Sequence, residues 1–178
     1  MLSVTKYQLD APSTSFTNDA VLACMQIIEN TLDVAIEAVL SRPLFCFLST
    51  VDSGRPRVSP LWFLWEDGAI WIIANTEKTY PGRIERNPVT ALAIVDFDRT
   101  TGTVQHVGMR GEATVEPHDP PRAERLLRRY LGPDKDAWDT NRFSDPSEWG
   151  EEMVMIRFDP DTVVARDQSY VPSPSVQN

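Results

Sequence analysis

The segment from residue 57 to residue 65 restricts the possible folds of this chain more than any other. It reads R-V-S-P-L-W-F-L-W, and successive side chains of a strand point to opposite faces of a sheet. The two alternating sets are Val58, Pro60, Trp62 and Leu64, and Ser59, Leu61, Phe63 and Trp65. Both are largely apolar, whereas a sheet with one solvated face alternates polar and apolar residues. We therefore expect this strand to be covered on both sides, by the core on one and by a partner chain or a ligand on the other.

Further short apolar runs bounded by turn residues predict a protein that is mainly β. The expected strands cover 44–51, 57–65, 69–75, 90–97 and 103–115, followed by a hairpin of 153–158 and 162–166 that turns at Asp159-Pro160-Asp161. Gly108 and Gly111 lie inside the 103–115 strand, and glycines there mark the bulges at which a sheet curls. The pattern predicts a closed or half-closed antiparallel barrel with flanking helices.

Three helices are expected around these strands. Apolar residues at three- and four-residue steps predict an amphipathic helix over 18–40, with Asn18 as its N-cap and a candidate break at 31–33. A short helix over 81–87 ends at Pro88, and a longer one over 119–131 ends at Gly132. Residues 133–151 are expected to form an ordered loop. The chain thus divides into a flexible arm (1–17), a single barrel domain (18–170) and a flexible tail (171–178).

Composition excludes several classes of function. The 178 residues include 17 basic and 26 acidic ones, a net charge of −9 that disfavours nucleic acid and anionic membrane surfaces as partners. We find no signal peptide and no run long enough to span a membrane, and two isolated cysteines, Cys24 and Cys46, suit a reducing compartment. The expected location is the cytoplasm. Two histidines are too few for a histidine-rich metal centre, so no metal site is expected.

Known catalytic motifs are missing, but one window differs in charge from the rest. The sequence has no GxSxG elbow, no Walker loop, no HExxH and no GxGxxG. Between Arg55 and Arg86 there are five basic residues and four acidic ones, although the whole chain is strongly acidic. This window therefore suits one small anionic ligand.

The same window resembles a known family. The runs G-R-P-R-V-S-P-L-W-F at 54–63, E-D-G-x-I-W at 66–71 and R-I-E-R-N-P at 83–88 resemble the flavin-binding split-barrel superfamily, which is named after pyridoxamine 5′-phosphate oxidase and includes deazaflavin-dependent reductases. F-D-x-x-x-G-x-V-Q-H-V-G at 97–108, with M-R-G-E-A-T-V-E-P after it, is similar to one bacterial branch. The resemblance covers about residues 40–132.

The resemblance implies a set of cofactor-binding residues. The second strand would lie along the flavin ring through Arg57, Val58, Ser59, Pro60, Leu61 and Trp62. The third strand and the loop after it would hold the ribityl chain and phosphate through Ile73, Ala74, Asn75, Thr76 and Lys78. We expect the phosphate to be held by Arg57, Ser59, Thr76, Lys78 and Arg83. Where the family commonly has a lysine, this chain has Tyr80, so Lys78 or Arg83 would supply the charge. Gln105 or His106 would face the ring or the substrate.

The resemblance also implies a function. It favours an FMN-binding oxidoreductase that moves a hydride through the flavin, with the cofactor in a cleft between the subunits of a homodimer, a small-molecule substrate and a reduced nicotinamide as a candidate donor. No protein nucleophile is required, and the tryptophan-arginine signature of true pyridoxamine phosphate oxidases is not recognisable. Alternatives are a deazaflavin-dependent reductase, a non-catalytic flavin or haem carrier with His106 as the haem ligand, and a purely structural barrel.

Overall fold

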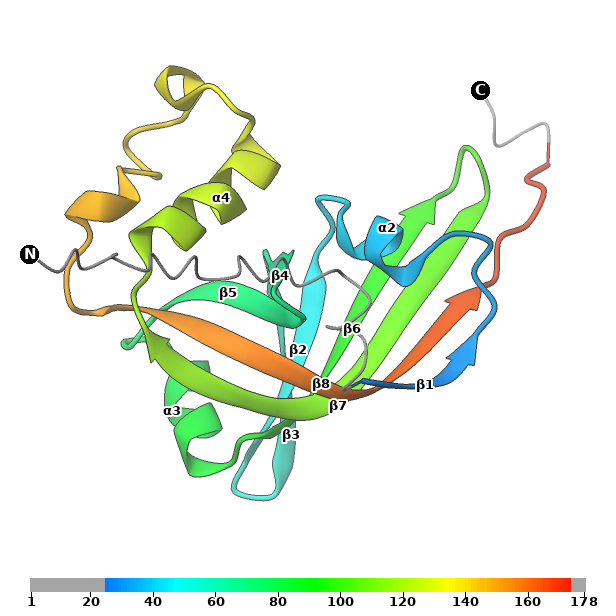
Figure 1. Cartoon of the computed structure of the whole chain (residues 1–178), viewed down its shortest axis with the longest axis horizontal. Coiled ribbons are helices and arrows are strands. Elements are labelled where there is room, and N and C mark those ends of the chain that lie inside the picture. The colour runs from blue at the N-terminus through cyan, green and yellow to red at the C-terminus, as the bar shows by residue number, and fades with distance from the viewer. Residues whose placement is uncertain (1–24, 174–178) are drawn as a thin grey trace, which may run out of the picture.

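The computed structural model describes residues 25–173, which form one mostly antiparallel sheet of eight strands with helices packed around it (Figure 1). The mainly β architecture with flanking helices expected from the sequence is confirmed. The arm 1–17 and residues 174–178 of the expected tail lie outside the described residues. The strands are β1 (Gln26–Asn30), β2 (Cys46–Asp52), β3 (Arg55–Leu61), β4 (Leu64–Glu66), β5 (Ala69–Asn75), β6 (Val89–Asp98), β7 (Thr103–Pro117) and β8 (Met153–Asp167). The helices are α2 (Ile36–Leu40), α3 (Thr79–Arg86) and α4 (Pro120–Leu131), with 3₁₀ turns at Lys135–Ala137 and Pro146–Glu148.

The order of strands shows why the sheet must curl. It runs β3-β2-β6-β7-β8-β5-β4, and β1 lies parallel to β8. Strands β3 and β4 therefore stand at opposite ends of the order, although only Trp62 and Phe63 separate them. Three residue steps span at most about 11 Å, so the two ends of the sheet must come close together. The expectation of one unbroken strand over 57–65 is wrong, because the chain changes edge in its middle.

The two longest strands, β7 and β8, are joined around a bulge. Their register shifts between Arg110 and Gly111, and Gly111 then lies opposite Pro160. A Cβ on Gly111 would come within 2.0 Å of the carbonyl oxygen of Asp159, so only glycine fits this close approach. The expected hairpin at Asp159-Pro160-Asp161 is wrong: the bulge accommodates a proline that lacks an N–H, and β8 runs through it as one strand.

The segment before β2 also differs from expectation. Residues 26–30 form β1 instead of part of a helix over 18–40, and only Ile36–Leu40 is helical. Residues 18–24 of that expected helix, with its Asn18 cap, lie outside the described residues. Backbone pairing of β1 with Thr162–Ala165 of β8 overrides the helical spacing of the apolar residues. The break expected at 31–33 falls where this strand ends.

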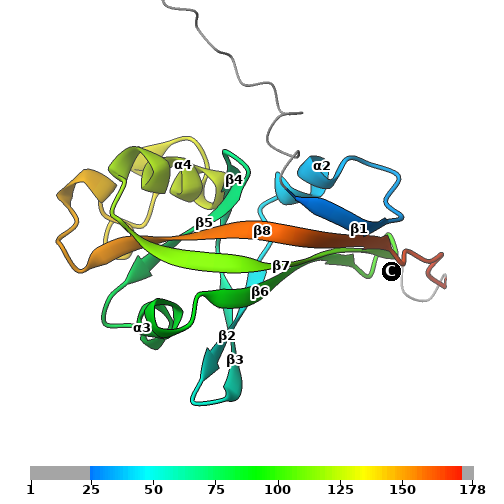
Figure 2. The same ribbon diagram turned by 60° about the horizontal axis from the view of Figure 1, so that its bottom comes forward.

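Helices α3 and α4 largely follow the sequence signals. Helix α4 begins at its N-cap Asp119, whose side chain accepts a 2.9 Å bond from the Arg122 N–H, and it ends at Gly132 with a φ of 93°. Glu124 and Arg128 form an i,i+4 ion pair along this helix at 2.8 Å. Figures 1 and 2 show α3 and the tip of the β2–β3 hairpin on one side of β7 and β8, and α4 on the other.

The core fills the inside of the curled sheet. Its largest fully buried side chains include Phe63, Leu48, Ile72, Ile94 and Phe158. None of the helices among residues 25–173 has the length and apolarity needed to cross a bilayer. In the same part of the chain, no group of three or more histidine, cysteine or acidic side chains is placed to hold a metal ion.

Candidate functional site

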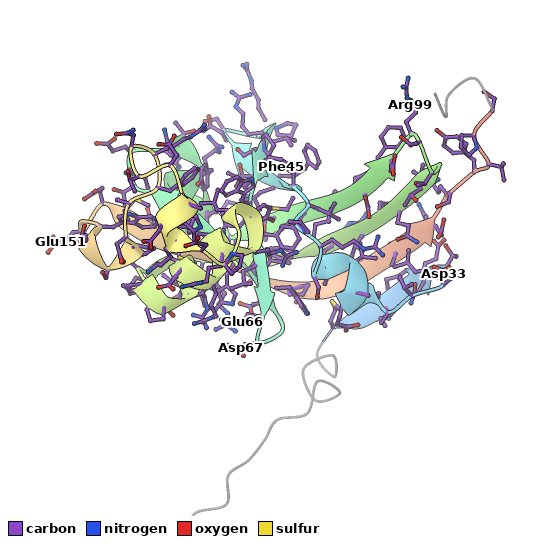
Figure 3. The ribbon with its side chains drawn as sticks, turned by 90° about the horizontal axis from the view of Figure 1, so that it is seen from above. Asp33, Phe45, Glu66, Asp67, Arg99 and Glu151 are labelled. Carbon is purple, nitrogen blue, oxygen red and sulfur yellow. The ribbon has the colours of Figure 1, made fainter. Side chains whose placement is uncertain are left out.

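A cavity of about 570 Å³ opens between the end of β3, helix α4 and the loop that follows α4. This volume lies in the range of about 300–1,000 Å³ that is usual for small-molecule sites. Its wall is mostly apolar and aromatic. The lining residues are Phe45 (labelled in Figure 3), Pro60, Leu61, Trp62, Ile73, Leu126, Leu127, Arg142, Phe143, Trp149, Glu152 and Met153.

A stack of three aromatic rings lies beside the cavity, and two of them, Trp62 and Phe143, line it. The ring of Trp62 lies between those of Tyr130 and Phe143, at centroid distances of 4.6 and 5.6 Å and interplanar angles of 3° and 18°. The hydroxyl of Tyr130 donates to the Leu44 carbonyl over 2.6 Å and accepts from the Phe63 N–H over 3.1 Å. Burial raises the pKa of Tyr130, which keeps this hydroxyl protonated. Tyr130 thus bonds backbone groups where the chain leaves β3, and this contact holds the break in place.

The loop 133–152 provides further lining residues, including Phe143, and is tied to α4. Lys135 pairs with Glu124 of that helix over 2.8 Å and with Asp145 over 3.3 Å. Trp138 is buried and donates from Nε1 to the Gly132 carbonyl over 3.1 Å. The loop is therefore an ordered wall, as the sequence predicted.

A buried arginine marks a second part of the site. The Nε of Arg83 donates to the Thr50 hydroxyl over 2.8 Å, and its Nη1 donates to the Thr79 hydroxyl over 2.6 Å. The residue is only 7% exposed, and it forms no ion pair within residues 25–173. A buried charge without a counterion is costly, so this arrangement favours an anion beside the guanidinium.

Strand β3 leads from this arginine to the cavity. Arg57 lies opposite Thr50 across the β2–β3 ladder, so both side chains share one face of the sheet, and Ser59 and Leu61 follow on that face. Arg57 makes no ion pair within the described part of the chain. Four residue steps separate Arg57 from the cavity residue Leu61, a distance of about 13 Å. An elongated ligand could lie along β3, with its anionic end at Arg57 and Arg83 and its flat apolar end in the cavity.

The start of α3 adds positive potential. Lys78 is the N-cap residue of this helix and provides no side-chain cap, and the first N–H groups of a helix lack intrahelical acceptors. Asn75 stabilises the turn that precedes α3. Its carbonyl accepts from the Lys78 N–H over 2.9 Å and its side chain accepts from the Glu77 N–H over 2.8 Å. Thr76 is exposed and bonds through its N–H to the carbonyl of Glu152, which lines the cavity.

Tyr80 is unavailable for binding an anion. It is buried, its hydroxyl donates to the Ile73 carbonyl over 3.4 Å, and burial raises its pKa to about 12. The position at which the family commonly has a lysine is therefore part of the core in this chain. In this chain the buried positive charge on the same helix is that of Arg83. Ala74, another predicted site residue, is also a core residue and lines neither cavity described here.

Gln105 and His106 lie in different surroundings. Gln105 is buried, accepts from Arg42 Nη1 over 2.9 Å and donates to Asp167 over 2.8 Å, so its side chain is engaged in a structural network. His106 points to the outer face of the sheet, where it lines a second hollow of about 510 Å³ together with Val58. The predicted residues are thus divided among the cavity, the arginine cluster, the core and the outer face.

The outer face is strongly apolar and uncovered in the single chain. Val58 is 62% exposed, Phe97 is 61% exposed, and Phe47 and Val95 are exposed as well. Exposed apolar side chains gathered on one face mark an interaction site more often than a solvated surface. The expectation that something covers the second face of β3 stays a prediction.

Several residues of the site were not identified from the sequence. Thr50 and Thr79 hold Arg83. The cavity is also lined by Leu126 and Leu127 of α4 and by Arg142, Phe143 and Trp149 of the loop. One signal was available: aromatic residues are unusual in an exposed polar loop, and the loop contains three. Its position against β3 depends on tertiary contacts that the sequence alone does not reveal.

Comparisons with known proteins agree on the architecture. The family model described as Pyridoxamine 5′-phosphate oxidase matches residues 32–165. No curated protein matches the chain. A solved F420 reductase is 23% identical with a TM-score of 0.57, over 74% of this chain and 98% of its own. A conserved hypothetical protein from Mycobacterium tuberculosis is 20% identical with a TM-score of 0.62, over 84% and 98%. A FAD-binding protein from Mesorhizobium loti is 17% identical with a TM-score of 0.55, over 74% and 89%. At these identities the solved structures establish the fold, a split barrel.

Proposed function

Because the chain belongs to the pyridoxamine 5′-phosphate oxidase family, we propose that it is an FMN-binding oxidoreductase that transfers hydride through the flavin. The observation that carries this proposal is the buried Arg83, which has no counterion within residues 25–173 and stands at the end of the strand that leads to the cavity. A phosphate beside Arg83 would provide the missing negative charge, and charge-assisted bonds of this kind are stronger than neutral ones.

The residues present fit such a cofactor along its whole length. Arg57, Lys78 and Arg83 would bind the phosphate, with the free N–H groups at the start of α3. Pro60, Leu61, Trp62 and Ile73 are lining residues of the cavity and would contact the ring. Strand β3 is at the end of the strand order, so one of its edges has unpaired backbone groups. Since Pro56 and Pro60 have no N–H, we expect the Val58 N–H to be the donor that this edge offers to the cofactor.

When bound, the flavin supplies the redox chemistry, accepting or releasing a hydride at N5. The chain contributes orientation through β3, and the apolar walls of the cavity exclude water from the reacting atoms. The donor proposed is a reduced nicotinamide, and the second reactant is a small molecule. A cytoplasmic location is part of the proposal and agrees with the free, buried Cys46.

We further propose that two copies associate through the outer face to complete the site. The exposed side chains on β2, β3 and β6 form an apolar surface on the side of the sheet opposite the core. His106 lies in the hollow on this surface, between Val95 and Arg166 in the strand register. In a two-fold dimer through this surface, the His106 side chain would face the partner copy.

A second candidate is a reductase that uses a deazaflavin in place of FMN. It is favoured by the fold shared with the F420 reductase at a TM-score of 0.57. Both cofactors are flat rings with a phosphate on a flexible chain, so both fit the line from the cavity to Arg83. Haem is the remaining alternative. It would bind in the hollow on the outer face, where His106 could be its iron ligand, and not in the cavity beside α4.

Binding measurements on the purified full-length protein distinguish these ligands. FMN should give a yellow, two-banded complex, and at one hundred times its dissociation constant it should stabilise the fold by about 2.7 kcal/mol. Riboflavin, which has the ring but no phosphate, should bind more weakly. If a deazaflavin stabilises the protein and FMN does not, the second candidate is favoured. A sharp absorption band in the violet after addition of haem would favour a non-catalytic haem carrier. If FMN and riboflavin bind equally, the phosphate site at Arg83 is wrong.

A further inference from the structure

The part of the cavity wall that comes from the loop after α4 has a charged residue for which the proposed cofactor has no need. Arg142 lines the cavity from the loop after α4, while the cofactor phosphate is assigned to Arg83 on α3. Figures 1 and 2 place α3 and α4 on opposite sides of β7 and β8. The two arginines therefore belong to separate ends of the site.

Within residues 25–173, Arg142 has no acidic partner. Its guanidinium lies 5.6 Å from the ring centroid of Phe143 and forms no ion pair. Glu152 lines the same cavity but does not pair with it; the carboxylate of Glu152 folds back against Gly150, whose added Cβ would lie 2.3 Å from Oε2. Arg142 is exposed, so the cavity has at its rim a positive group that forms no ion pair with the described residues.

The surroundings of Arg142 are aromatic and held in place. Phe143 stacks on Trp62, and Trp149 stacks on His118 with a centroid distance of 5.3 Å. The Nε1 of Trp149 also donates to the Ser144 hydroxyl over 2.8 Å. Rigid aromatic walls bind flat apolar molecules, and an arginine at their rim binds a carboxylate or phosphate.

We propose that the substrate of this site is a flat, unsaturated molecule that carries an acidic group, and that Arg142 recognises this group. The inference rests on the proposed function, because it assigns the β3 wall to the flavin ring and the loop wall to the substrate. The second reactant would then belong to one chemical class, the conjugated or aromatic acids.

The test compares 2-naphthoate with 2-naphthamide, which has the same ring system and no charge. Trp62 and Trp149 line the cavity, so quenching of tryptophan fluorescence reports binding without any cofactor. The wild-type protein should bind the acid more tightly than the amide. In Arg142→Gln the affinity for 2-naphthoate should fall about tenfold and that for 2-naphthamide should stay unchanged. Arg142→Lys should lie between the two, since it keeps the charge and loses the bidentate geometry.

Arg99→Gln is the matched control. Arg99 is exposed in the β6–β7 turn, at the end of the molecule opposite Glu151 (Figure 3), and should leave both affinities unchanged. Equal loss for the acid and the amide in Arg142→Gln, no loss for either, or failure of the wild type to prefer the acid would each overturn the proposal. FMN affinity, measured separately, should be the same in Arg142→Gln as in the wild type. Loss of FMN binding in this variant would assign Arg142 to the cofactor instead.

The two proposals fail separately. If FMN does not bind but Arg142 still selects the acid over the amide, the cofactor assignment is wrong and the anion site stands. If FMN binds and the acid is not selected, the substrate class is wrong and the cofactor site stands.

Discussion

The Nε of Arg83 donates a 2.8 Å hydrogen bond to the hydroxyl of Thr50, a residue 33 positions earlier in the chain. Thr50 is itself buried and lies opposite Arg57 in the β2–β3 ladder. Through Thr50, Arg83 of α3 lies on the same face of the sheet as Arg57 of β3. It is the relationship on which the proposed phosphate site depends.

Replacing Arg83 by methionine should weaken FMN binding by at least tenfold, because a hydrogen-bonded charge pair contributes about 1.5–3 kcal/mol. Riboflavin affinity should change little, since riboflavin has no phosphate. Titration of the visible flavin spectrum measures both. Arg86→Met is the control on the same helix: Arg86 is exposed, its contact with Asp52 is 3.9 Å long, and FMN affinity should not change. Unaltered FMN binding in Arg83→Met would contradict the phosphate site.

A charge in the middle of the outer face should disrupt the proposed dimer. Ala93 lies on β6 between Phe47 of β2 and Gly108 of β7, so a glutamate there would be desolvated in the interface. Sedimentation velocity should show a dimer for the wild type and a monomer for Ala93→Glu. Val171→Glu, at a tail residue that is 94% exposed, should remain dimeric. A wild-type monomer at micromolar concentration rules this interface out.

Acid stability should depend on Glu66, which is labelled in Figure 3. Bonds from Arg125 and then Arg122, each 2.7 Å long, hold the pKa of this carboxyl below its ordinary value of 4.5. The group is ionised and stabilising above about pH 4.5, and the stabilisation is lost as the pH falls through the lowered pKa. Its side chain is 23% exposed, so the pair is partly shielded from solvent.

Glu66→Gln should therefore lower the free energy of unfolding by about 1–3 kcal/mol at pH 7. The difference from the wild type should shrink below pH 4.5, because the wild type then loses the same bonds. Urea unfolding at several pH values measures it. Asp67→Asn, whose side chain is 74% exposed, should have a small effect at every pH. A Glu66→Gln difference that is constant from pH 7 to pH 3 disproves this assignment.

Gly111→Ala should destabilise the barrel by about 1–3 kcal/mol, since the added methyl group would overlap the Asp159 carbonyl oxygen and force β7 and β8 apart. Urea unfolding provides the measurement. Gly82→Ala is the comparison: it lies in α3, where the nearest atom to the added Cβ is the flexible tip of Arg86 at 3.5 Å. That variant should be neutral or more stable by up to about 1 kcal/mol. Equal effects of both substitutions would show that the bulge is not tight.

Half of the eight strands were predictable because their information is local. The strands β2, β5, β6 and β7 lie within one or two residues of the apolar runs that predicted them, and so does α4 with its cap at Asp119. A strand that is buried on one side must repeat its apolar residues, and a helix must be capped by its neighbours in sequence. Both requirements are readable without knowing the rest of the fold.

The errors all involve distant pairing. The strand β1 forms because β8 offers it an edge, β8 passes Pro160 because Gly111 is opposite, and β3 ends at Leu61 because Tyr130 binds the backbone beyond it. Each of these decisions depends on residues that are roughly 50 or more positions away. Local propensity cannot anticipate them, since the same segment would behave differently beside another neighbour.

The sequence by itself determined the fold class, the family and the basic residues from which an anion site is built. Only the tertiary structure decided which of them act together: Arg83 is buried against Thr50, Tyr80 is in the core, Gln105 is engaged with Arg42 and Asp167, and Arg142 lines a cavity with Trp62. The physical reason is that charge and shape are properties of single residues, whereas burial and the lack of a counterion exist only after distant segments have packed.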